Sequence, residues 1–265
     1  MAPLDGCYAK LARAEFHLLE LGVRVRDYLS SAPFRIVGEY DDTAHEYVMK
    51  AEQAADYPPV PAELILIAGE VVHQLRSALD HLVWDLVVEQ TGEPPPGTDD
   101  GFPIFSTADG YNRRAHQKVR GVSAAAADLI KVWQPYHLGD RAEEELIWAV
   151  QALNNTDKHR LIPVTLIYAF VGAVNMTVDN NPPVEILPWQ EFMRDALVDG
   201  MEVARVAVAD GDRATFNVPV GVDIAFERVG DLRNHPVNDL LSKMTHHVGR
   251  LIHSFRPEFA ALRAF

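Results

Sequence analysis

The sequence predicts an α+β protein in which an antiparallel β-sheet is inserted into a helical bundle. Segments near both ends of the chain repeat apolar residues at the spacing of an amphipathic helix. Residues 215–226 instead alternate apolar and polar side chains, as a strand with one covered face does. The 265 residues, 48% of them hydrophobic, can form one large core, so a single domain over 1–265 is expected. The helical core is expected at about 1–31, 61–155 and 235–257, and the inserted sheet at about 160–228.

The first part of the chain predicts helices and one β-hairpin. A helix over 4–30 ends before Pro33, because proline disfavours helical backbone in the residue that precedes it. Two strand-like runs around an Asp-Asp-Thr turn predict a hairpin over 34–51. A long helix over 62–90 follows, with Pro61 suited to its first turn. Beyond a proline-rich loop at 91–103, shorter helices are expected at 108–120, 123–133 and 140–153.

Strands and a closing helix are predicted for the rest of the chain. The apolar run 161–178 is rich in Val, Ile, Thr, Tyr and Phe, which predicts a buried strand and not a membrane span. The run 201–208 is expected to pair with 215–226 through the hairpin turn at 210–212, which reads Asp-Gly-Asp. An amphipathic helix over 237–255 is expected to pack on the two long helices.

The charge balance limits the partners that the chain can bind. A formal net charge of −14 argues against DNA and against an anionic membrane surface, although it leaves room for a local basic cleft. Cys7 is the only cysteine, so no internal disulfide can form, which suits a reducing cytoplasm. The first residues lack the basic and apolar regions of a signal peptide. We therefore expect a cytoplasmic protein that does not contact membranes.

A polar stripe interrupts the otherwise apolar helix over 62–90. Its members lie three, four, seven and eight residues after the first, which predicts a single helix face. They are His73, Arg76, Ser77, Asp80 and His81. In one interpretation Arg76 and Asp80 form a structural ion pair flanked by histidines. In the other, His81 moves a proton and Arg76 holds a phosphate or an oxyanion.

A second polar cluster lies where the helix expected to end near 153 meets the next strand. It consists of Asn154, Asn155, Asp157, Lys158 and His159. Capping of the helix end explains part of this cluster, since cations there are favoured by the helix dipole. The alternative is a functional site held between two rigid elements. With both clusters combined, the candidate catalytic residues are Arg76, Asp80 and His81, and the candidate substrate-binding residues are His73, Ser77, Asn154, Asp157, Lys158 and His159.

Four sequence blocks carry a resemblance to known proteins. The blocks are L-R-S-A-L-D-H-L at 75–82, F-P-I-F at 102–105, Q-P-Y at 134–136 and N-x-x-D-K-H-R at 154–160. In this order they resemble blocks of a group of uncharacterised bacterial proteins. The spacing Arg76-x4-His81 also resembles the R-x4-6-H motif of the HEPN ribonucleases, which are small helical bundles.

The HEPN resemblance implies RNA cleavage without a metal, in an active centre formed across a homodimer. It implies that His81 transfers the proton when a ribose 2′-hydroxyl attacks, and that Arg76 stabilises charge at phosphorus. The leading expectation is therefore a HEPN-like protein that cleaves RNA or binds a nucleotide, in defence or stress response.

Two other function classes stay open. One is a ligand-binding or interaction protein without catalysis, and the other is a metal-dependent hydrolase of the bundle type. The helix over 62–90 carries candidate metal ligands but no H-x3-H pair, so neither a metal nor another cofactor is expected.

Overall fold

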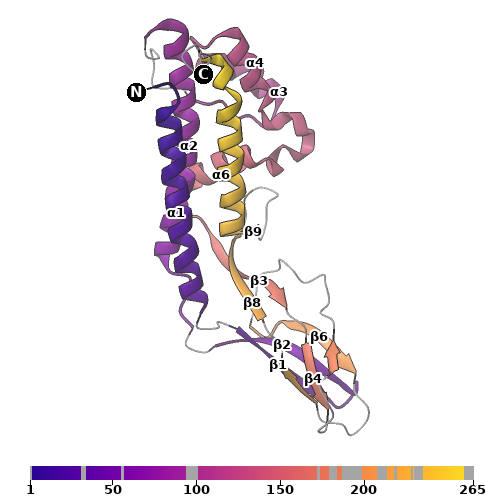
Figure 1. Cartoon of the computed structure of the whole chain (residues 1–265). Helices are drawn as coiled ribbons and strands as arrows, with labels where there is room; N and C mark the ends of the chain where they lie inside the picture. The colour runs from indigo at the N-terminus through magenta and orange to yellow at the C-terminus, as the bar shows by residue number, and fades with distance from the viewer. Residues whose placement is uncertain are drawn as a thin grey trace.

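The helices and the strands gather at opposite ends of an elongated molecule (Figure 1). Helix α1 begins, and helix α6 ends, at the helical end of the molecule. This computed structural model describes residues 2–30, 34–54, 57–93, 101–171, 174–178, 184–186, 199–207, 214–217, 220–227, 229 and 235–259.

Four helices form the body of the helical end. α1 and α2 run antiparallel, because the Leu4 N–H donates to Asp85 Oδ2 over 2.9 Å near one end, and Arg24 Nη1 lies 2.9 Å from Glu63 Oε1 near the other. α5 and α6 both pack against α2. The helix bounds are α1 Asp5–Leu29, α2 Ala62–Thr91, α3 Ala108–Lys118, α4 Ala124–Val132, α5 Leu146–Asp157 and α6 Val237–Ser254, with 3₁₀ helices η1 Pro135–Glu144 and η2 Arg256–Glu258.

α2 is the central helix of this body. Leucines recur along it every three or four residues, and each is at most 3% exposed: Leu75, Leu79, Leu82 and Leu86. Burying a leucine side chain contributes about 1.5–3 kcal/mol, so this face alone holds α2 firmly against its neighbours. The helix ends at Gly92, whose N–H donates to the Val88 carbonyl over 2.8 Å. Gly92 has φ +74°, a left-handed conformation that glycine adopts without strain.

The strands form three small antiparallel sheets in the described part of the chain. Their orders are β1-β2-β6, β3-β8-β9 and β5-β4-β7. The predicted hairpin is confirmed as β1 and β2, which pair from Phe34↔Gln53 to Asp41↔Glu46. The strand bounds are β1 Phe34–Asp41, β2 Glu46–Gln53, β3 Val164–Val171, β4 Val174–Val178, β5 Val184–Ile186, β6 Glu202–Ala207, β7 Ala214–Asn217, β8 Val220–Phe226 and β9 His235–Pro236.

Two predictions about the inserted strands are wrong. The alternating run 215–226 is two strands, since β7 pairs with β4 and β8 pairs with β3. Pro219 separates them in the sequence, and proline has no N–H for a strand ladder. The segment 201–208 contributes β6, which pairs with β2 and not with β7 or β8. Pairing to the hairpin is a long-range contact that local turn signals do not reveal, and the predicted turn at 210–212 lies outside the described residues.

The run 161–178 also forms two strands, β3 and β4, which lie in different sheets. The helix predicted over 140–153 differs as well. It is a 3₁₀ helix up to Glu144, followed by α5, which continues to Asp157. Leu153 and Asn154 are both buried, so packing on α2 carries the helix one turn beyond the predicted end.

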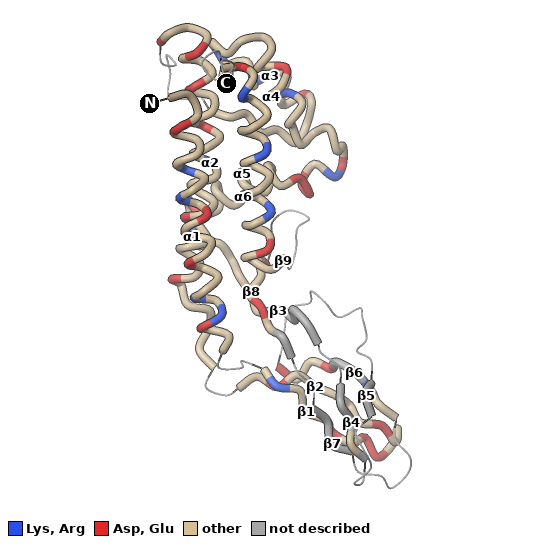
Figure 2. The backbone as a smooth tube through the Cα atoms, in the orientation of Figure 1, with Lys and Arg blue, Asp and Glu red and all other residues tan. Residues whose placement is uncertain are grey.

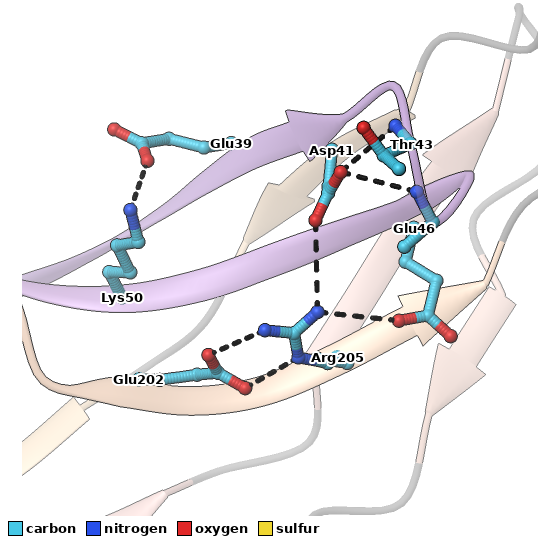
Figure 3. A network of polar contacts seen from close by, with 8 residues as sticks. Glu39, Asp41, Thr43, Glu46, Lys50, Glu202 and Arg205 are labelled. Carbon is cyan, nitrogen blue, oxygen red and sulfur yellow. Dashed lines mark hydrogen bonds and ion pairs between the residues drawn. The ribbon is translucent and has the colours of Figure 1, made fainter.

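One arginine joins the outer strand β6 to the hairpin. Arg205 Nε lies 2.7 Å from Glu202 Oε1, while Arg205 Nη1 lies 3.8 Å from Glu46 Oε2 and 3.9 Å from Asp41 Oδ2 (Figure 3). Asp41 also accepts the N–H groups of Ala44 and Thr43 in the turn, and these bonds lower the pKa of its carboxyl. Because exposed ion pairs are individually weak, the network acts chiefly to fix the register of β2 and β6.

No helix in the described residues has both the length and the apolar content needed to cross a membrane.

Candidate functional site

A cavity of about 650 Å³ lies at the helical end, between α2, α3, α5 and the segment 101–107. Its volume falls in the range of small-molecule sites in proteins. The described residues that line it are mostly polar: Arg76, Asp80, Gly101, Ile104, Phe105, Ser106, Thr107, Arg114, Gln117, Lys118, Trp148, Gln151, Asn154, Asn155 and Lys158.

One stripe of α5 forms a wall of this cavity. Trp148, Gln151, Asn155 and Lys158 follow each other at intervals of three or four residues, so they lie above one another on the helix. Between them, Ile147, Val150 and Leu153 turn into the hydrophobic core and are at most 2% exposed. The apolar face therefore anchors α5 and directs its polar stripe into the cavity.

Arg76 and Asp80 of α2 form an ion pair that holds the segment 101–105. Arg76 Nη2 lies 2.6 Å from Asp80 Oδ1, and Arg76 Nε donates to Asp80 Oδ2 over 3.2 Å. Asp80 Oδ1 also accepts the Phe102 N–H over 3.0 Å, while Arg76 Nη2 donates to the Phe102 carbonyl over 2.9 Å. The pair thus satisfies both backbone groups of one residue in an irregular segment.

Two glutamines complete the hydrogen bonds of this segment. Gln134 Nε2 donates to the Pro103 carbonyl over 2.8 Å, and Gln134 Oε1 accepts the Phe105 N–H over 3.2 Å. Gln151 Nε2 donates to the Ile104 carbonyl over 3.2 Å. Buried backbone groups without partners are costly, so these side chains fix the floor of the cavity.

Three cations line the cavity without an ion-pair partner in the described part of the chain: Arg114, Lys118 and Lys158. The Arg114 guanidinium lies over the Phe105 ring, 5.0 Å from its centre. Acidic and basic positions are interspersed along the helices (Figure 2), so the excess of positive charge is a local property of the cavity.

Asn154 is a buried amide with no bonding partner in its surroundings. The residue is 4% exposed and lines the cavity, and the structure shows no side-chain hydrogen bond for it among the described residues. Burying an amide without a hydrogen bond is unfavourable, so its donor and acceptor need water or a ligand in the cavity.

The cavity brings together only part of the predicted site. Arg76, Asp80, Asn154 and Lys158 line it, which joins the two clusters found in the sequence. The other predicted residues do not line it: His73, Ser77, His81, Asp157 and His159.

His81 lies on a different side of α2 from Arg76. Five residues on an α-helix correspond to a rotation of about 140°, whereas the four residues from Arg76 to Asp80 give about 40°. The imidazole packs against α1, because a Cβ atom at Gly6 would lie 2.6 Å from His81 Nδ1. The expectation that His81 shares a cleft with Arg76 is therefore corrected: each residue faces a different neighbour.

Asp157 and His73 lie away from the cavity as well. A Cβ atom at Gly69 would collide with the Asp157 carboxylate, so Asp157 packs directly on α2. Burial, with a contribution from Glu70, raises the pKa of this carboxyl. His73 and His159 are exposed.

Several lining residues were missed in the sequence analysis. Trp148 and Gln151 have a sequence signal, because they share a helical face with Asn155 and Lys158 once the helix is continued to Asp157. Arg114, Gln117 and Lys118 have none, since their place opposite α5 depends on how the segment 101–107 folds.

The structure gives no support to metal or thiol chemistry. In the residues that it describes, no group of three His, Cys, Asp or Glu side chains could hold a metal ion. Burial, followed by the nearby Asp85, raises the pKa of the Cys7 thiol to about 12. A thiol that stays protonated at neutral pH is a poor nucleophile.

Comparisons with protein-family models, with curated proteins and with solved structures found no match.

Proposed function

We propose that the cavity between α2, α3 and α5 binds a small phosphorylated ligand of the nucleotide class. The observation that carries this proposal is the set of three cations, Arg114, Lys118 and Lys158, which line one cavity without a carboxylate partner in the described part. The chain as a whole has a net charge of −14, so such a concentration of positive charge needs a specific reason. Arginine and lysine are the side chains that bind phosphate best.

The other lining groups suit the rest of a nucleotide. Trp148 and Phe105 offer aromatic surface on which a base can stack, and the amides of Asn154, Asn155 and Gln117 can donate and accept hydrogen bonds. The proposal therefore takes up the nucleotide-binding form of the function expected from the sequence.

Binding is favoured over RNA cleavage because no histidine lines the cavity in the described part of the chain. General acid and base catalysis near neutral pH needs a group that titrates there. RNA cleavage by Arg76 and His81, and the homodimer that the HEPN resemblance implies, stay predictions. An assay of RNA with wild-type protein and with His81→Ala in chelator tests cleavage directly.

The proposal is tested by calorimetric titration of the protein with AMP, with adenosine as the uncharged probe. Arg114→Ala removes a cation from the cavity, and its neighbour Arg113→Ala is the matched control, because Arg113 is 71% exposed and paired with Asp109 outside the cavity. Loss of a charge-assisted hydrogen bond costs about 1.5–3 kcal/mol, so Arg114→Ala should weaken AMP binding about tenfold or more.

Arg113→Ala and the wild type should bind AMP equally, adenosine should bind much more weakly, and added salt should weaken AMP binding. If wild-type protein fails to bind AMP, or if both arginine variants lose affinity equally, the proposal is wrong.

A further inference from the structure

The cavity has two chemically different ends. Trp148 lies one helical turn before Gln151, whose amide binds the carbonyl next to Phe105, so the two aromatic residues lie at the same end. Lys158 lies at the other end of the α5 stripe, with Asn154 and Asn155 beside it. The ten residues from Trp148 to Lys158 correspond to about 15 Å along a helix. A ligand that contacts both ends is therefore elongated, with an aromatic part and an anionic part.

The charges favour more than one phosphate. A phosphate monoester carries about −1.5 to −2 at neutral pH, which leaves part of three cations uncompensated. Lys118 and Lys158 also approach the cavity from different helices, α3 and α5, so a single phosphate is poorly placed to neutralise both. A chain of phosphates can extend between them.

The cavity is poorly equipped to hold a magnesium ion together with such a chain. Asp80 is the single carboxylate among the described residues that line it. Its two oxygens already accept from Arg76, and Oδ1 also accepts from the Phe102 N–H. Magnesium bound with phosphates usually has one or two free carboxylates as ligands. The cations of the protein itself would therefore neutralise the phosphates.

From these observations we infer that the ligand is a nucleotide with two or more phosphates, bound without Mg²⁺. The base stacks at the Trp148 end, and the phosphate chain extends towards Lys158 and Lys118. Asn154, buried beside the cations, donates to a phosphate oxygen. This inference rests on the proposed function and adds the length, the orientation and the metal independence of the ligand.

The first test compares AMP, ADP and ATP by calorimetric titration of the full chain in chelator, followed by the same titrations in excess Mg²⁺. Each added phosphate should form a further charge-assisted hydrogen bond with the cations, so ATP should bind about tenfold or more tightly than AMP. Excess Mg²⁺ should weaken ATP binding, because the ion competes with the cations of the cavity for the same oxygens.

The second test fixes the orientation. Trp148→Leu should reduce ATP affinity towards that of inorganic triphosphate, and should leave the binding of inorganic triphosphate unchanged. Trp84→Leu is the matched control, since Trp84 is 51% exposed on α2 and lies outside the cavity. Circular dichroism spectra that match the wild type show that each variant is folded.

The outcomes separate the two proposals. Equal affinity for AMP and ATP, or ATP binding that requires Mg²⁺, overturns this inference and leaves the proposed function standing. Equal effects of Trp148→Leu on ATP and on inorganic triphosphate overturn the orientation. Failure of the wild type to bind any nucleotide overturns both proposals.

Discussion

Single residues decide what the cavity can hold. Arg114 and Arg113 are neighbours in the chain, yet one guanidinium lies over Phe105 in the cavity and the other pairs with Asp109 outside it. Asn154 differs from Gln151 in the same way, because the Gln151 amide is bonded to backbone and to Arg76 whereas the Asn154 amide has no such partner among the described residues. Sequence alone predicts that these groups are polar, but not which of them are already satisfied.

Gly101 is the residue of the cavity floor that tolerates least change. A Cβ atom there would lie 2.8 Å from Asp80 Oδ1 and 3.3 Å from Arg76 Nη2, both held by the ion pair. Gly101→Ala should therefore lower the free energy of unfolding by about 1–3 kcal/mol, as overpacking does. Urea denaturation measures the change.

Gly22→Ala on α1 is the control for that substitution. Its Cβ would meet ordinary contacts at 3.7 Å and 3.9 Å, and alanine favours the helix by up to about 1 kcal/mol. Stability should be equal or higher in this variant. A Gly101→Ala protein as stable as the wild type would show that the Arg76 and Asp80 side chains are free to move aside.

At the scale of the elements, α2 and the segment 101–105 act as one unit. Arg76 and Asp80 join them through the hydrogen bonds to Phe102, so the pair has the structural role that was one of the two interpretations of its spacing. The four-residue spacing predicted the pair itself. It could not predict the bonds to Phe102, because these join residues 22 or more positions apart across a loop.

A double-mutant cycle tests this role. Arg76→Ala leaves Asp80 and the Phe102 carbonyl without their donor, so it should lower the free energy of unfolding by about 1–3 kcal/mol. Asp80→Ala should have a similar cost. The double variant should cost less than the sum of the two, with a coupling of about 0.5–3 kcal/mol. Thermal or urea unfolding of the four proteins gives the coupling.

Additive effects in that cycle would contradict the structural role. A purely catalytic Arg76 makes the opposite prediction, namely loss of activity with unchanged stability.

Helix positions were predicted better than strand pairing, for a physical reason. α1, α2 and α6 carry their apolar spacing within one segment, and each is found close to its predicted bounds. Strand partners are chosen by long-range packing, so the partner of β6 and the division of 215–226 between two sheets were not readable from local patterns.

Across the whole molecule, one buried titratable pair links α6 to the start of α5. His247 Nε2 lies 3.2 Å from Glu145 Oε1, and both side chains are largely buried. Burial, with smaller contributions from Arg250 and His246, lowers the pKa of His247 below its ordinary value. Burial raises the pKa of Glu145.

The lowered pKa of His247 predicts a pH dependence of stability. The unfolded chain binds a proton at the ordinary histidine pKa near 6.5, while the folded protein resists it, so folding is disfavoured as pH falls through that value. The free energy of unfolding should therefore fall between about pH 7.5 and pH 6, and His247→Gln should reduce that slope. Glu145 acts in the opposite sense at lower pH, because its protonated form is favoured by burial.

Urea denaturation across this pH range measures the slope, with the exposed His253→Gln as control. An identical slope in His247→Gln and in the wild type would show that this pair does not determine the pH response.

The chain leaves the helices for the hairpin and returns to them at almost the same place. The Tyr28 hydroxyl donates to the Pro58 carbonyl over 3.0 Å, and the Tyr57 hydroxyl donates to the Tyr28 carbonyl over 2.7 Å. The hairpin is thus mounted on a closed stem, with α1 and α2 fixed to each other beneath it. Such an attachment is modular: its length and sequence can be exchanged in evolution, or by grafting, while the ligand-holding end of the molecule keeps its geometry.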